Sequence, residues 1–139
     1  MIFCQLGDIM IKILFAVAAI ATMSACATKP ATSPTAIAPS LYSAPTAGSV
    51  PVTITRDGGI IGAACGINVR VDDNPVAKLR ASQSISLFIP AGRHILSIQT
   101  GNMCGGVRDA IDVTLTPDEP KNYRIGTDMG SNVQLIPTL

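Results

Sequence analysis

Residues 84–98 read SISLFIPAGRHILSI, and this stretch decides the fold class. Isoleucine or leucine stands at every second position from 85 to 89, which is typical of a β-strand that buries one face. Residues 90–92, Pro-Ala-Gly, then turn the chain into a second alternating run, in which Leu96 and Ile98 point to one side. The stretch therefore predicts two neighbouring strands joined by a tight turn.

The same period of two recurs on both sides of this stretch, between clusters of Gly, Pro, Asp and Asn. About eight short strands with turns roughly every 8–12 residues indicate an all-β fold. We expect a small antiparallel β-sandwich over residues 50–139, with a small barrel as the alternative. The apolar positions that would build its core are Val50, Val52, Ile54, Ile67, Val69, Val71, Ala77, Leu79, Ile85, Leu87, Ile89, Leu96, Ile98, Ile111, Val113, Leu115, Tyr123, Ile125, Val133 and Leu135.

The composition of the 139-residue chain excludes two classes of protein. Hydrophobic residues make up 47% and charged residues only 14%, which is too apolar for a disordered chain. The net charge is +1, so no overall field attracts nucleic acid. Aromatic residues make up 4%, which leaves few rings for stacking bases. We therefore expect no nucleic-acid partner.

The N-terminus carries the features of an export signal. Residues 13–23, ILFAVAAIATM, form an uncharged run of eleven residues directly after Lys12. A membrane-spanning helix needs about 20 apolar residues, whereas a signal peptide needs a run of about 7–15 after a basic start. The sequence predicts a signal peptide over residues 1–25. Met10 is an alternative start of translation, because the residues before it do not fit a signal.

Residues 23–26, Met-Ser-Ala-Cys, resemble the lipobox of bacterial lipoproteins, although that family most often has Leu at the position of Met23. The resemblance implies that Cys26 is lipidated and becomes the first residue of the mature protein, anchoring it to a membrane. Ala27 stands where many such proteins have an inner-membrane retention Asp, which implies the outer membrane, facing the periplasm. Two alternatives stay open: cleavage after Ala27, which gives a soluble periplasmic protein, and an uncleaved signal anchor.

Residues 26–49 are predicted to be a flexible, lipid-anchored linker. Pro, Ala, Thr and Ser dominate this segment, and no hydrophobic period is sustained in it. Such a composition is typical of a semi-extended spacer between a membrane and a domain. The alternative is that Leu41 and Tyr42 dock on the domain as an edge.

Cys65 and Cys104 are predicted to form a disulfide. If Cys26 is acylated and Cys4 is lost with the signal, these two cysteines remain as a pair, and an exported protein usually oxidises such a pair. A redox couple usually has the Cys-x-x-Cys spacing, which is absent, and a metal site would want nearby His or further Cys. Free thiols are the third possibility. We expect no cofactor and no metal.

The chain offers little for catalysis. His94 is the sole histidine, and a hydrolytic triad would have to combine it with residues such as Ser97 and Asp109. No serine lies in a Gly-x-Ser-x-Gly pattern. The Asp-Asp-Asn of residues 72–74 lacks the spaced oxygen pattern of a calcium loop and is typical of a turn. We therefore expect no enzymatic activity and no catalytic residues.

Residues 68–79, NVRVDDNPVAKL, followed by residues 84–98, look like the V-x-V-D-G-x-P-V-A-x-L … L-P-x-G-x-H-x-L-x-V pattern of PEGA-like β-domains. Small uncharacterised bacterial lipoproteins carry a related module, and the later Cys-Gly-Gly of residues 104–106 and Tyr-Arg-Ile of residues 123–125 fit that version. The turn that contains Asn74 departs from the pattern, which usually has Gly there. The resemblance covers roughly residues 50–137. It implies a non-catalytic binding or scaffolding module and no particular ligand.

Together these features predict an envelope lipoprotein: an anchor at Cys26, a spacer, and a β-domain that presents loops to a protein or cell-wall partner. The alternative is an accessory lipoprotein subunit of a secretion or envelope machine, in which the domain docks through an exposed strand edge.

Overall fold

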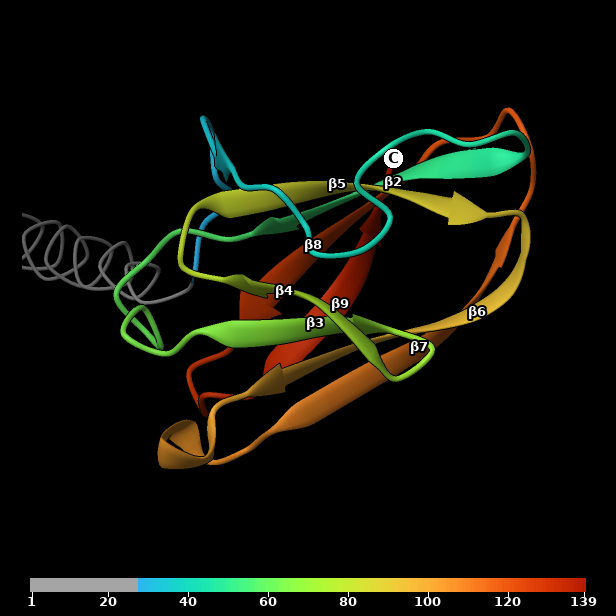
Figure 1. The fold of residues 1–139 in the computed structure, drawn as a ribbon. Helices are drawn as coiled ribbons and strands as arrows, with labels where there is room; N and C mark the ends of the chain where they lie inside the picture. The colour runs from blue at the N-terminus through green and yellow to red at the C-terminus, as the bar shows by residue number, and fades with distance from the viewer. Residues whose placement is uncertain (1–27) are drawn as a thin grey trace, which may run out of the picture.

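The computed structural model describes residues 28–139, which form a sandwich of two β-sheets (Figure 1). One sheet has the strand order β1-β5-β2-β8-β9, and the other has the order β4-β3-β6-β7. The predicted all-β sandwich is thus confirmed. The strands are β1 (Thr35–Ala36), β2 (Ser49–Arg56), β3 (Ile67–Val71), β4 (Asn74–Leu79), β5 (Gln83–Pro90), β6 (Gly92–Thr100), β7 (Arg108–Leu115), β8 (Lys121–Thr127) and β9 (Val133–Thr138), with a 3₁₀ helix, η1 (Asn102–Cys104), between β6 and β7.

The core lies between the sheets and consists almost entirely of Val, Ile and Leu. These residues come from alternate positions of the strands, because successive side chains of a strand point to opposite faces. Two predicted core positions, Ala77 and Ile111, are only partly buried. In β4, Val76 and Leu79 are buried while Ala77 is only partly buried. The register against β3 shifts between Val69 and Arg70, so one residue of β4 bulges and its inward phase changes.

The sheets are not purely antiparallel, which corrects the predicted arrangement. β8 pairs with β2 in parallel, and the short β1 pairs with β5 in parallel. A parallel pair needs a long crossover connection. Here the chain leaves the first sheet after β2, builds β3 and β4, returns for β5, builds β6 and β7, and only then adds β8 beside β2.

Residues 28–48, here called the N-terminal arm, run along the domain instead of forming a free linker (Figure 1). This corrects the predicted spacer and agrees with the alternative in which Tyr42 docks at an edge. The backbone of the arm satisfies hydrogen-bonding groups at the outer edge of β5 and beside β4, which a sheet edge otherwise leaves open. The bonds are Thr35 N–H to Ser82 O (2.8 Å), Ile37 N–H to Ser84 O (2.9 Å), Ser40 N–H to Val76 O (2.7 Å) and Phe88 N–H to Tyr42 O (2.9 Å).

The predicted signal peptide, residues 1–25, and the predicted lipidation site at Cys26 lie outside the described residues. In residues 28–139 no helix is long and apolar enough to cross a membrane.

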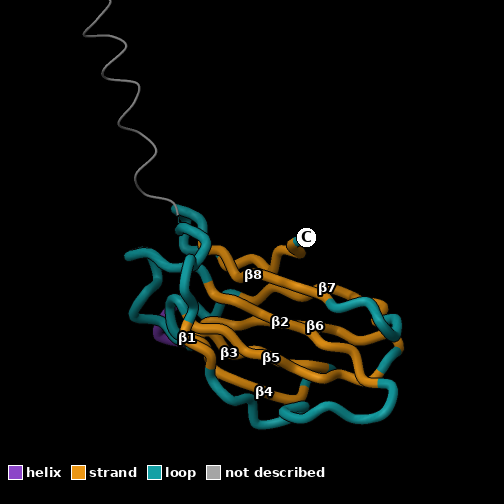
Figure 2. The backbone as a smooth tube through the Cα atoms, turned by 90° about the horizontal axis from the view of Figure 1, so that it is seen from above, coloured by secondary structure: helices purple, strands orange, loops and turns teal. Residues whose placement is uncertain are grey.

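The two ends of the sandwich carry different connections (Figure 2). We call one of them the loop end; it carries the β2–β3, β4–β5, β6–β7 and β8–β9 connections, which are residues 57–66, 80–82, 101–107 and 128–132. The other, the turn end, carries the β3–β4, β5–β6 and β7–β8 connections, which are residues 72–73, 91 and 116–120. The described chain begins at the loop end, because the Thr28 hydroxyl donates to the Thr127 carbonyl and Lys29 bridges to Gly58.

Candidate functional site

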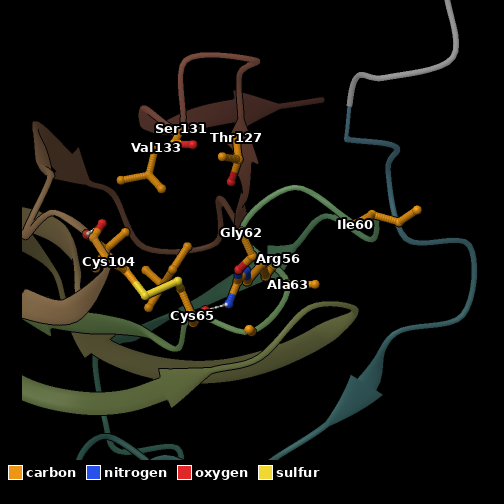
Figure 3. A pocket seen from close by; sticks show the side chains of 12 residues that line it. Arg56, Ile60, Gly62, Ala63, Cys65, Cys104, Thr127, Ser131 and Val133 are labelled. Carbon is orange, nitrogen blue, oxygen red and sulfur yellow. Dashed lines mark hydrogen bonds between the residues drawn. A yellow bond between two sulfur atoms is a disulfide. The ribbon is translucent and has the colours of Figure 1, made fainter.

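A cavity of about 490 Å³ opens at the loop end between the two sheets (Figure 3). Three connections surround it: β2–β3, β6–β7 and β8–β9. Its walls combine apolar side chains with a few hydroxyls and one guanidinium. The lining residues are Arg56, Ile60, Gly62, Ala63, Ala64, Cys65, Ile67, Thr100, Cys104, Thr127, Ser131 and Val133.

The predicted disulfide is present and forms one wall of this cavity (Figure 3). Cys65 and Cys104 are joined with a Cα–Cα distance of 6.1 Å, within the usual range for a disulfide. Cys104 ends η1, and Gly105 and Gly106 follow with φ of 88° and 60°. Glycine adopts such left-handed angles without strain, so these two residues end the 3₁₀ turn and direct the chain into β7. The disulfide ties the β2–β3 connection to the β6–β7 connection along the wall of the cavity.

Arg56 is the buried charge of the cavity. Its side chain is 3% exposed, and its guanidinium donates to the carbonyls of Gly62 (2.6 Å), Cys65 and Leu79 (2.9 Å). Burial lowers the pKa of Arg56, although a guanidinium stays charged at any ordinary pH. Arg56 therefore fixes the path of the β2–β3 connection. Arg56 was not singled out as a buried residue from the sequence. It lies two residues after the buried Ile54 on β2, and this spacing predicts that both side chains point to the same side of the sheet.

Asp57 follows Arg56 and points to the other side of the first sheet. It is 4% exposed, and within the described chain neither of its carboxylate oxygens accepts a hydrogen bond. The nearest cation is Arg124, whose Nη2 lies 3.5 Å from Oδ2 of Asp57. Burial raises the pKa of Asp57, and the charge of Arg124 opposes this shift only in part. A hollow of about 210 Å³ beside the N-terminal arm borders this pair.

Three large apolar side chains project from the connections around the cavity, and we call them the apolar tips. Ile60 is 96% exposed, Met103 is fully exposed and Met129 is 74% exposed. They belong to three different connections of the loop end. Figure 3 shows Ile60 pointing away from the disulfide. Between Ile60 and the start of the N-terminal arm lies a third hollow of about 630 Å³.

His94 lies at the turn end, away from the cavity. Its Nδ1 is 2.6 Å from Oδ2 of Asp72, and its Nε2 is 2.8 Å from the carbonyl oxygen of Pro90. His94 makes no hydrogen bond to Asp109 in the described chain; Oδ2 of Asp109 instead accepts a hydrogen bond from the Leu135 N–H. A hydrolytic triad of His94, Ser97 and Asp109 is therefore not assembled.

The turn predicted at residues 72–74 is confirmed. Asp72 and Asp73 both have positive φ, 49° and 64°, as a two-residue hairpin turn between β3 and β4 requires. The Asp72 carboxylate accepts from the Ile95 N–H and contacts His94, and these two bonds lower the pKa of Asp72. Among residues 28–139 no three His, Cys, Asp or Glu residues gather in a way that could hold a metal ion.

Comparisons with protein-family models, with curated proteins and with solved structures found no match to this chain. The resemblance to PEGA-like β-domains thus stays a prediction, and the function must be argued from the chain's own residues.

Proposed function

We propose that this protein is an envelope lipoprotein of the outer membrane, anchored through Cys26 and facing the periplasm. Its β-sandwich acts as a non-catalytic binding or scaffolding module for a protein or cell-wall partner. The order of parts along the chain supports this: a signal-like apolar run, a small-residue site ending in Cys26, and then a strand-rich domain.

The observation that carries the proposal is the Cys65–Cys104 disulfide. Disulfides persist in exported proteins and are rare in the cytosol, where thiols are kept reduced. The domain also needs this support, because about 110 residues form a modest core and the link closes the otherwise open loop end. A disulfide-linked domain downstream of a signal-like segment is the arrangement expected of an exported protein.

The cavity favours binding over catalysis. Its one charged group, Arg56, uses three of its five N–H donors on backbone carbonyl oxygens, and a guanidinium stays protonated at any ordinary pH, so it cannot exchange a proton with a substrate. The remaining polar groups on its walls are hydroxyls of Thr100, Thr127 and Ser131. Acid–base catalysis needs a titratable group within reach of the substrate. The described walls of this cavity are better suited to holding an apolar group than to transferring a proton.

Intact mass spectrometry of the full-length protein extracted from bacterial membranes tests the proposal. We expect a chain that begins at Cys26, carries two or three acyl chains and is two hydrogens lighter than the reduced form. Cys26→Ser should abolish incorporation of labelled palmitate, while the matched variant Cys4→Ser should leave it unchanged. A mass that retains the leader with reduced cysteines, or palmitate labelling that survives Cys26→Ser, would overturn the proposal.

A further inference from the structure

The apolar tips occupy one end of the molecule. Ile60, Met103 and Met129 are each more than 70% exposed, and each sits in a different connection of the loop end. Toward the opposite end the exposed large apolar residues are Leu139, the last residue of the chain, which follows the part of β9 paired with the start of β8, and Ile95, which is 52% exposed and is hydrogen-bonded to Asp72. Leu41 in the N-terminal arm is 44% exposed. Several large apolar side chains projecting from neighbouring loops are typical of a surface that contacts another molecule or a membrane.

The loop end is also poor in charge. Residues 57–66 contain one charged residue, the buried Asp57, and residues 101–107 contain none. The remaining charges of the connections are Arg80 and Asp128. At the turn end, by contrast, four carboxylates stand in two short connections: Asp72, Asp73, Asp118 and Glu119. Only the loop end could approach an apolar phase without desolvating a group of carboxylates.

The N-terminal arm places the anchor beside the same end. Thr28 and Lys29 are bonded to Thr127 and Gly58, and Cys26 precedes Thr28 by two residues. Consecutive Cα atoms are about 3.8 Å apart, so two peptide units span at most roughly 8 Å, and a lipid attached at Cys26 would be tethered close to Thr28. The arm cannot act as a spacer, because it is hydrogen-bonded to the domain from its first described residues.

We infer that the loop end rests on the lipid bilayer, with Ile60, Met103 and Met129 inserted among the lipid headgroups. The inference rests on the proposed anchor at Cys26 and adds the orientation of the domain and the surface that meets the lipid. An anchored domain stays at a high effective concentration beside the bilayer, so even weak insertion of each tip is well populated. Amphipathic helices that lie in the membrane interface bury their apolar face about 5–10 Å, at the boundary between headgroups and acyl chains, and we expect the tips to reach the same boundary. The turn end then faces away from the membrane.

Single-tryptophan reporters test this orientation, because the chain contains no Trp. Ile60→Trp, Met103→Trp and Met129→Trp are placed one at a time in the full acylated protein, and Leu139→Trp serves as the matched exposed control. Each protein is reconstituted in phosphatidylethanolamine–phosphatidylglycerol vesicles with or without brominated acyl chains. We expect emission at shorter wavelength and roughly twofold or greater quenching by bromine at the three tips, since bromine quenches only rings that reach the acyl boundary. The Leu139→Trp emission should stay unchanged.

The outcomes separate the two proposals, because the intact mass of the same samples reports acylation. An acylated protein whose tips are no more quenched than Leu139→Trp overturns the orientation and leaves the proposed function standing. A protein without acyl chains at Cys26 overturns both. A shift to shorter wavelength without quenching by bromine would place the tips against protein, such as a second copy of the chain, and would also overturn the contact with lipid.

Discussion

The two ends of the sandwich are built from the same strands but are held together in different ways. At the turn end the connections are short and stabilised locally: Asp72 and Asp73 adopt positive φ, and Asp72 contacts His94 on the neighbouring β6. At the loop end residues 57–66 and 101–107 are long and contain many glycines, and they are held by a disulfide and by the buried Arg56. The difference indicates that the turn end mainly connects the strands, whereas the loop end forms an exposed surface. Substitutions at each end test this contrast.

The largest effect is expected from removing the disulfide. Reduction of the link in residues 28–139 should lower the free energy of unfolding by about 3–4 kcal/mol, because a closed segment of 39 residues restricts the unfolded chain. Denaturant unfolding with and without reductant measures this difference. The double variant Cys65→Ser/Cys104→Ser is the control, and reductant should not change its stability. Equal stability of the oxidised and reduced wild-type chains would contradict the prediction.

Replacing the buried arginine should also weaken the loop end. Arg56→Met leaves three carbonyl oxygens without their donor and should cost about 2–3 kcal/mol of unfolding free energy. The matched variant is Arg93→Met at the exposed ion pair with Asp112, where little change is expected because solvent screens exposed pairs. Thermal melts of both variants compare the two sites. A larger loss for Arg93→Met would show that the loop end does not depend on its buried charge.

The docked N-terminal arm gives a smaller effect. The Ser40 hydroxyl donates to the carbonyl oxygens of Pro75 and Val76, so Ser40→Ala should cost about 1 kcal/mol. The amides of Thr35, Ile37 and Ser40 should exchange slowly with deuterium because each donates a backbone hydrogen bond. The control for Ser40→Ala is Ser43→Ala, because no hydrogen bond from the Ser43 hydroxyl is found among the described residues. Rapid exchange at all three amides would contradict the docked arm and would support the flexible linker that the composition predicts.

Two carboxylates should contribute to stability with opposite pH dependence. The pKa of Asp72 is lowered in the fold, so its contribution to stability is present above the unfolded pKa of about 3.9 and is lost as the pH falls through the folded pKa. The pKa of Asp57 is raised, so its contribution is present below the unfolded pKa and is lost as the pH rises through the folded pKa. Asp72 supports the fold at neutral pH, and Asp57 opposes it.

At neutral pH, Asp72→Asn should therefore lower the unfolding free energy by about 0.5 kcal/mol after solvent screening. Asp57→Asn should raise it by about 1 kcal/mol, because a buried charge without hydrogen bonds is removed. Urea unfolding at neutral pH and near pH 4 compares the two variants: the Asp57→Asn difference should shrink near pH 4, whereas the Asp72→Asn difference should largely persist there and be lost only at lower pH, as the pH falls through the folded pKa of Asp72. Changes of the same sign in both variants would contradict the opposite roles of the two carboxylates.

Much of the fold could be predicted because it depends on local patterns. The alternation of Ile85, Leu87 and Ile89 reports which side chains face inward, and Asp-Asp-Asn reports a turn. Alternation carries no information on strand direction, so the parallel pairing of β8 with β2 could not be predicted from it. It also cannot reveal the register shift that brings Val76 inward.

The loop end was harder to predict. The cysteine pair could be predicted by elimination, whereas the N-terminal arm could not, because it is held mainly by backbone hydrogen bonds that depend little on side-chain identity. The apolar tips could not be singled out, since single exposed apolar residues are common and become informative only when the fold gathers them at one end.

Hydrogen–deuterium exchange of the whole molecule tests the central claim, which is that the loop end lies against the membrane that Cys26 anchors. Exchange is compared between the acylated protein on vesicles and the unacylated chain of residues 28–139 in solution. The proposed orientation predicts slower exchange on vesicles in residues 57–66, 101–107 and 128–132, with no change in residues 72–73 and 116–120. Equal exchange in the two states, or slowing confined to the turn end, would contradict it.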